Sequence, residues 1–176
     1  ILTSPGGYSE YAHRWEDPLG VPCRTMVDRL GMVCDYPTIG ELKTSVDPSP
    51  PAFCGKFEIV RGEYVVTINR RGQAWKFGYH HQAGFNRRGI ANALGGIVPN
   101  YYFVVVRNEA PFEVAVYRAS DKFLETGRVE VEATMTKLAE CLQDSTGAKW
   151  SMPWETLPGG NIPTINAPYE EAGESH

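Results

Sequence analysis

Residues 56–88 read KFEIVRGEYVVTINRRGQAWKFGYHHQAGFNRR, and this stretch decides the fold that the sequence predicts. Between residues 64 and 69, β-branched and aromatic residues alternate with other residues, which is the period of a strand. Gly72 then closes a short turn, because glycine reaches backbone angles that other residues avoid. Aromatic rings recur at every second position from Trp75 to Tyr79. We therefore expect a β-hairpin whose aromatic face packs on a core.

The same stretch is the most basic part of the chain. It holds seven Lys or Arg residues and two Glu, whereas the whole chain carries a net charge of −4. Such a local excess can bring a basic face to an anionic partner. Asn86 is expected to begin a short helix that Gly95 and Gly96 end, which places two arginines in its first turn, where an anion would offset them. The candidate binding residues are Arg70, Arg71, Trp75, Tyr79, Arg87 and Arg88.

The four cysteines lack the Cys-x-x-Cys spacing of zinc and redox sites. Their even number favours two disulfides, and we expect the pairs Cys23–Cys34 and Cys54–Cys141. Free, buried cysteines in a cytosolic protein are the alternative. Disulfides persist in oxidising compartments, so this interpretation predicts a secreted protein. The chain begins with Ile1, which fits a mature form after processing. No apolar run approaches the length of a membrane helix, so no membrane span is expected.

The remaining segments supply further helices and strands. An apolar stripe predicts a helix over residues 22–30, and residues 38–41 have the spacing of a helix capping box. Residues 101–107 and 112–117 alternate as the two strands of a hairpin. Residues 128–143 fit both a strand period and a helical period, and we expect a helix over residues 130–143.

Together these segments predict a single α+β domain. We expect an antiparallel sheet of about four to six strands, packed with two or three helices and stabilised by disulfides. Residues 1–20 are interpreted as an irregular N-terminal arm and residues 22–150 as the α+β core. Residues 151–176 form a Pro/Gly-rich C-terminal tail in this interpretation.

His80 and His81 are neighbours in the predicted second strand of the central hairpin. Neighbours on a strand point to opposite faces, so the pair is not expected to chelate a metal, and no cofactor is predicted. One histidine could still act as a general acid or base, because histidine titrates near neutral pH. RNA cleavage also needs a carboxylate and a cation for the phosphate. The candidate catalytic residues of such a ribonuclease are Glu58, Arg61, His80 and His81, with Glu63 and Arg70 as alternatives.

In layout and residue types, a helix followed by an antiparallel sheet over residues 22–118 resembles microbial guanyl-specific ribonucleases and the ribonuclease-like secreted effectors of fungal pathogens. The resemblance implies a secreted ribonuclease or an RNA-binding protein. We expect such a protein to work through the basic aromatic hairpin and the turn at Arg87 and Arg88.

The leading hypothesis from the sequence is a secreted, non-enzymatic interaction module of effector or toxin type. It would bind a host or competitor protein through the basic aromatic hairpin. The ribonuclease or RNA-binding protein is the first alternative, and a glycan-binding module that stacks sugars on Trp75 and Tyr79 is the second.

Overall fold

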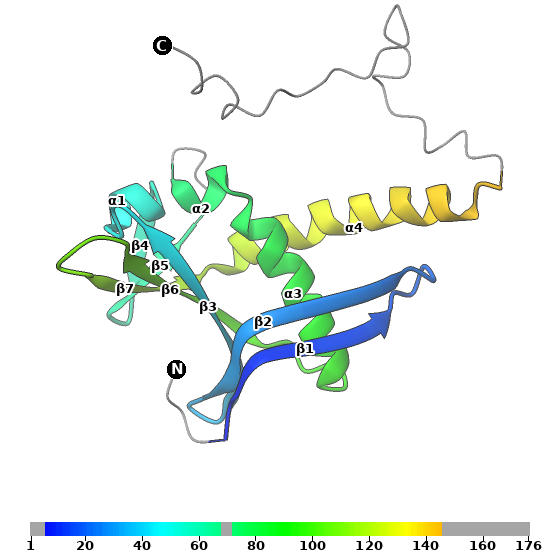
Figure 1. The fold of residues 1–176 in the computed structure, drawn as a ribbon, viewed down its shortest axis with the longest axis horizontal. Coiled ribbons are helices and arrows are strands. Elements are labelled where there is room, and N and C mark those ends of the chain that lie inside the picture. The colour runs from blue at the N-terminus through cyan, green and yellow to red at the C-terminus, as the bar shows by residue number, and fades with distance from the viewer. Residues whose placement is uncertain (1–5, 68–71, 146–176) are drawn as a thin grey trace, which may run out of the picture. The chain divides into compact units, whose positions relative to one another are not determined.

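The computed structural model describes residues 6–67 and 72–145, and its centre is one seven-stranded mixed sheet (Figure 1). The strands are β1 (Tyr8–Glu16), β2 (Pro22–Val33), β3 (Tyr36–Ser45), β4 (Phe57–Val60), β5 (Glu63–Val66), β6 (Asn100–Arg107) and β7 (Val114–Ala119), and the helices are α1 (Pro50–Phe53), α2 (Gln73–Lys76), α3 (Tyr79–Ala93) and α4 (Asp121–Gln143). The strand order is β1-β2-β3-β6-β7-β5-β4. Because β3 pairs with β6 and β5 pairs with β7 in parallel, the expected purely antiparallel sheet is wrong.

The first three strands form an antiparallel meander where the sequence suggested an arm and a helix. Residues 8–16 form β1, and the predicted helix over residues 22–30 is wrong, because these residues lie in β2. The helical stripe would bury Met26 beside Val27, yet Met26 is 55% exposed and Val27 is fully buried. This alternation is that of a strand with one face on the core. The expected capping box likewise lies inside β3.

The hairpin predicted over residues 101–117 is confirmed, and it supplies the centre of the sheet. β6 pairs antiparallel with β7 on one side and parallel with β3 on the other. Its residues from Tyr101 to Val105 are all buried, as expected for a strand covered on both faces. Phe103 and Tyr117 contribute to the core, where the Tyr117 ring stacks on Phe53.

The stretch of residues 56–88 folds differently from the predicted hairpin. Its hairpin is β4–β5, which turns at Arg61 and Gly62, both with positive φ. Residues 73–76 form α2 instead of a second strand, and Gly78 in the left-handed conformation separates α2 from α3. The predicted turn, with Arg70 and Arg71, lies outside the described residues.

Helices α3 and α4 pack closely at two glycines. A Cβ on Gly127 would lie 1.8 Å from the carbonyl oxygen of His80, and one on Gly84 would lie 2.5 Å from the carbonyl carbon of Gly127. Only glycine fits such an approach without displacing a helix. The helix predicted over residues 130–143 is confirmed, although α4 begins earlier, at Asp121. By backbone contacts, the described residues up to Ala139 belong to one compact unit.

The expected disulfides are wrong, because no two of the four cysteines lie at disulfide distance. Cys23 and Cys34 stand near opposite ends of β2. A strand rises about 3.3 Å per residue, so these cysteines are separated by roughly 35 Å, whereas a disulfide needs Cα atoms within about 7 Å. The predicted C-terminal tail lies outside the described residues. Within the described ranges, no helix has the length and apolar character needed to cross a membrane.

Candidate active site

Two carboxylates come together on the adjacent strands β2 and β3. Asp28 follows the buried Val27 on β2 and is exposed, whereas Glu41 on β3 is only 2% exposed. The backbone N–H of Leu42 donates to Asp28 Oδ2 at 2.7 Å, which ties the first carboxylate to the strand that carries the second. The antiparallel pairing of β2 and β3 thus brings together two residues that are 13 positions apart in the sequence.

Lys43 lies on the same strand, two residues after Glu41. Its Nζ donates to Glu41 Oε2 at 3.4 Å and to Gln82 Oε1 at 2.9 Å. The ammonium also lies over the ring of Tyr79, 4.9 Å from the centroid. Because residues i and i+2 share one face of a strand, the spacing Glu-x-Lys places both charges on the side that α3 covers.

Helix α3 holds the buried carboxylate of Glu41 through two amides. Gln82 Nε2 donates to Glu41 Oε2 at 3.2 Å, and Asn86 Nδ2 donates to Glu41 Oε1 at 2.9 Å. These two residues are four apart, so they lie on one face of the helix. Asn86 Oδ1 in turn accepts from Thr25 Oγ1 at 2.7 Å. The network satisfies both carboxylate oxygens and fixes their position.

The Glu41 carboxyl has a strongly perturbed pKa. Its pKa is raised to about 7, mainly by burial and also by the neighbouring Asp28 charge, while Lys43 and the hydrogen bond from Asn86 oppose the rise. A carboxylate that is buried beside a second carboxylate is stabilised when a proton or a cation binds to it. Strongly perturbed groups of this kind concentrate at functional sites.

Sequence reasoning missed this site, because it assigned Asp28 to a helix and Glu41 to a helix cap. A usable signal was present in residues 38–45, which read TIGELKTS. A strand that buries Ile39 must also point Glu41 and Lys43 toward the same side. An acid and a lysine at inward positions of a strand are costly unless they serve a site.

The residues predicted for a ribonuclease do not converge. Glu58 lies on the edge strand β4, and Arg61 lies in the β4–β5 turn. His80 and His81 lie on α3, and both face Glu130 of α4. Among the described residues, no contact joins either histidine to Glu58 or Arg61.

The predicted binding residues also separate. Trp75 stacks on the His80 ring at 4.2 Å between centroids, and Tyr79 packs against the core, so the two rings form no exposed shelf for sugars. Arg88 pairs with the buried Asp17.

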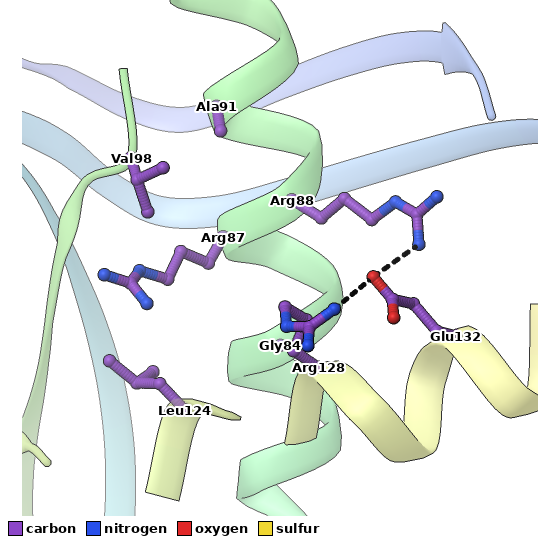
Figure 2. Close-up of a pocket in the computed structure, with 8 residues that line it drawn as sticks. All are labelled: Gly84, Arg87, Arg88, Ala91, Val98, Leu124, Arg128 and Glu132. Carbon is purple, nitrogen blue, oxygen red and sulfur yellow. Dashed lines mark ion pairs between the residues drawn. The ribbon is translucent and has the colours of Figure 1, made fainter. Parts of the chain in front are cut away.

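Arg87 and Arg88 line a groove of about 330 Å³ between α3 and α4 (Figure 2). Figure 2 shows Arg88 and Arg128 directed at Glu132 and Arg87 on the other side of the groove. The N–O distances from Arg88 and Arg128 to Glu132 are 3.7 and 2.6 Å. Arg87 Nε donates to the carbonyl oxygen of Pro99 at 2.9 Å. No carboxylate within the described ranges forms an ion pair with Arg87, so its charge is available to an anion.

A mixed sheet with an Asp on one strand and a Glu-x-Lys triplet on the next defines a domain of PDDEXK type. The sequence matches, over residues 3–151, the model of a family described as a PDDEXK-like domain of unknown function (DUF3799). The match covers most of the chain, so this protein belongs to that family. The family name spells a sequence pattern of one-letter residue codes. Its first acid corresponds to Asp28, and its acid-x-Lys triplet corresponds to Glu41-Leu42-Lys43. Val27 occupies the position of the proline in the pattern.

A solved structure shares the fold. It is the crystal structure of a "Putative exonuclease" from Eubacterium rectale, with a TM-score of 0.53 and 13% sequence identity. The likeness covers 84% of this chain and 53% of that chain, so this chain spans about half the length of the Eubacterium rectale protein. No curated protein matches the sequence.

These findings correct the hypothesis of a non-enzymatic effector or toxin, and with it the ribonuclease-like fold. The family is PDDEXK-like, and the candidate site is a buried acid with a lysine and a second acid. The prediction of secretion depended mainly on the disulfides. Because these are absent, that prediction has lost its main support, and localisation stays a prediction.

Proposed function

We propose that this chain is a nuclease domain that hydrolyses phosphodiester bonds of nucleic acid with the help of a divalent cation held by Asp28 and Glu41. The observation that carries the proposal is the buried Glu41 carboxylate, with its raised pKa, beside Asp28 and Lys43. A structural role explains neither the burial of an acid nor its placement next to a second acid.

The donor set fits a hard cation. Carboxylate oxygens are the ligands that Mg²⁺ and Mn²⁺ prefer, and these ions keep several waters when only one or two carboxylates bind them. Asp28 is exposed and Glu41 is buried, so the pair offers one oxygen donor toward solvent and one toward the protein. A bound cation would relieve the mutual repulsion that helps to raise the pKa of Glu41, and would lower the charge barrier to a polyanionic substrate.

Lys43 and Gln82 supply the chain's own contribution to the reaction. The Lys43 ammonium stands beside the carboxylate pair, where it can stabilise negative charge that develops on the phosphate. Gln82 accepts from Lys43 and donates to Glu41, so it fixes the distance between the two charges. Gln82 also lines a groove of about 410 Å³ between α3 and α4, with His81 and Phe85.

DNA is the substrate we propose, on the basis of the exonuclease name of the Eubacterium rectale protein. RNA carries the same phosphodiester and belongs in the same assay. Arg87 supports a polyanionic substrate, because its half-buried guanidinium has only a backbone carbonyl as hydrogen-bond partner among the described residues.

The test is cleavage of end-labelled linear double-stranded DNA, single-stranded DNA and RNA by the purified chain, with Mg²⁺, with Mn²⁺ and with EDTA. The variants are Glu41→Gln and Lys43→Gln, with Glu58→Gln as the matched control, because Glu58 is exposed on β4. We expect cleavage that depends on the cation and falls at least about 100-fold in the first two variants, the size seen when one charge-stabilising group is removed.

Two results would refute the proposal. One is cleavage that persists in EDTA, and the other is cleavage that Glu41→Gln leaves unchanged. Loss of activity in Glu58→Gln alone would instead indicate that the residues first predicted for a ribonuclease carry the activity. Comparison of the three substrates decides between DNA and RNA.

A further inference from the structure

His80 and His81 converge with Glu130 at the contact between α3 and α4. His80 Nε2 lies 3.1 Å from Glu130 Oε2, and His81 Nε2 lies within hydrogen-bond distance of the same oxygen. The ligand atoms of the three residues all lie within 4.8 Å of one another. The sequence argument against a metal site assumed a strand, in which neighbours point apart. On a helix they are separated by about 100° around the axis and can reach a common point.

The packing of the two helices builds this cluster. Gly127 lies against the carbonyl oxygen of His80, and Glu130 follows Gly127 by three residues, or nearly one helical turn. The close approach of the two helices therefore brings the Glu130 carboxylate within hydrogen-bond distance of the two histidines in the first turn of α3. Figure 1 shows α4 running beside α3. A larger residue at position 127 would move that carboxylate away from both histidines.

The His80 ring is held in place before any ligand arrives. It is 3% exposed and stacks on Trp75 with centroids 4.2 Å apart and planes 3° from parallel. Phe123 contacts the same ring at its edge. His81 and Glu130, by contrast, are half-exposed, so the cluster opens to solvent on one side. A fixed, buried imidazole beside two accessible ligand groups has the form of an open metal site.

We propose that His80, His81 and Glu130 bind a transition-metal ion of the Zn²⁺ class, which joins α3 to α4. Two imidazole nitrogens and one carboxylate oxygen are borderline donors that suit Zn²⁺, Co²⁺ and related ions better than Mg²⁺. Three protein ligands leave at least one position for water or a small molecule. The site is separate from Asp28 and Glu41, whose all-oxygen donors select a harder ion, and it does not depend on the proposed nuclease activity.

The protonation of the cluster is compatible with binding. Burial, followed by the nearby His81, lowers the pKa of His80 below its ordinary value, which favours the neutral imidazole. The groups that face it are His81 and Glu130, with the uncharged Trp75 and Phe123 on its other sides. Imidazole binds metal only in its neutral form, so metal affinity should fall as the pH is lowered.

The test is titration of the full chain with Zn²⁺ by calorimetry and with Co²⁺ by visible absorption. Glu41→Gln serves as the parent, because it removes one oxygen ligand of the candidate active site. Further changes are His81→Ala and Glu130→Gln, both at half-exposed residues, with His13→Ala as the matched histidine control on β1. We expect one ion per chain in the parent and in His13→Ala. Affinity should fall at least about tenfold in each of the other two variants, since even the loss of an outer-sphere partner costs that much.

Three results would overturn the site. They are no binding at millimolar Zn²⁺, equal affinity in His81→Ala and the parent, and loss in only one of the two ligand variants. Circular dichroism of each variant establishes that its fold is retained. Cys34 is an exposed thiol, so the titration is repeated with Cys34→Ser, and binding that disappears with this change would also count against the proposal.

Discussion

Glu41→Gln should make the cation-free protein more resistant to unfolding at high pH while it removes activity. Burial raises the pKa of Glu41 to about 7 in the folded protein, against an ordinary value of 4.5. A shift of this size corresponds to about 3 kcal/mol of folding free energy, at about 1.4 kcal/mol per pKa unit. Folding buries the Glu41 carboxylate. The ionised carboxylate therefore destabilises the folded protein unless a divalent cation binds beside it.

Proton linkage determines whether the stability of the protein rises or falls with pH. The folded state binds the Glu41 proton more tightly than the unfolded state does, so the contribution to stability is fully present below about pH 4.5. It is lost as the pH rises through about 7. The side-chain amide that replaces the carboxyl in Glu41→Gln does not titrate. The free energy of unfolding of wild type should therefore fall relative to that of Glu41→Gln by up to about 3 kcal/mol across this window.

The assay is urea denaturation of both proteins in EDTA at several values between about pH 4.5 and 8, the window given by the linkage relation. Glu58→Gln, at an exposed position, should run parallel to wild type. Added Mg²⁺ should reduce the decline in wild type and leave Glu41→Gln unchanged, because a ligand stabilises the state that binds it. A difference between wild type and Glu41→Gln that stays constant with pH would refute the perturbed carboxyl and, with it, the basis of the proposed cation site.

Three further predictions concern the helices. Gly127→Ala should lower the free energy of unfolding by about 1–3 kcal/mol or more, because the new methyl meets the His80 carbonyl; a change below about 0.5 kcal/mol would contradict the close packing. Asn86→Ala should lower the free energy of unfolding, measured by urea denaturation, by about 1–3 kcal/mol, because its buried partners lose a hydrogen bond. An unchanged denaturation midpoint would contradict this network. Arg87→Gln should weaken DNA binding and reduce the log–log salt slope by about 1, measured by fluorescence anisotropy; an unchanged slope would remove Arg87 from the substrate path.

The sequence predicted the local elements whose pattern is unambiguous. The β6–β7 hairpin was predictable, because its strands are strongly apolar and alternate, and the end of α3 was predictable from Gly95 and Gly96. Helix α4 was also found, although its start was placed too late. These elements depend on neighbours in sequence, so local periodicity is enough to predict them.

The active site was not predictable in the same way, because its geometry arises from pairing between distant segments. Asp28 and Glu41 become neighbours only when residues 22–33 form a strand, and that segment also fits a helical stripe. Once it is read as a helix, Glu41 reads as a cap and the acid pair disappears. The aromatic alternation at residues 75–79 misled in the opposite direction, since these rings pack from helices.

Helix α3 explains why a short segment can serve several sites. Successive residues on a helix are turned by about 100°, so Gln82 and Asn86 face the Glu41 carboxylate of the sheet while Arg87 faces the groove beside α4. His80 and His81, which directly precede Gln82, face Glu130. A change in the packing at Gly84 and Gly127 would thus move two groups at the same time. These are the histidine cluster and the two amides that bind Glu41. We therefore expect substitutions at this helix contact to change both the metal affinity of the His81 site and the cleavage that depends on Glu41. Substitution of a ligand in one site should leave the other site unchanged.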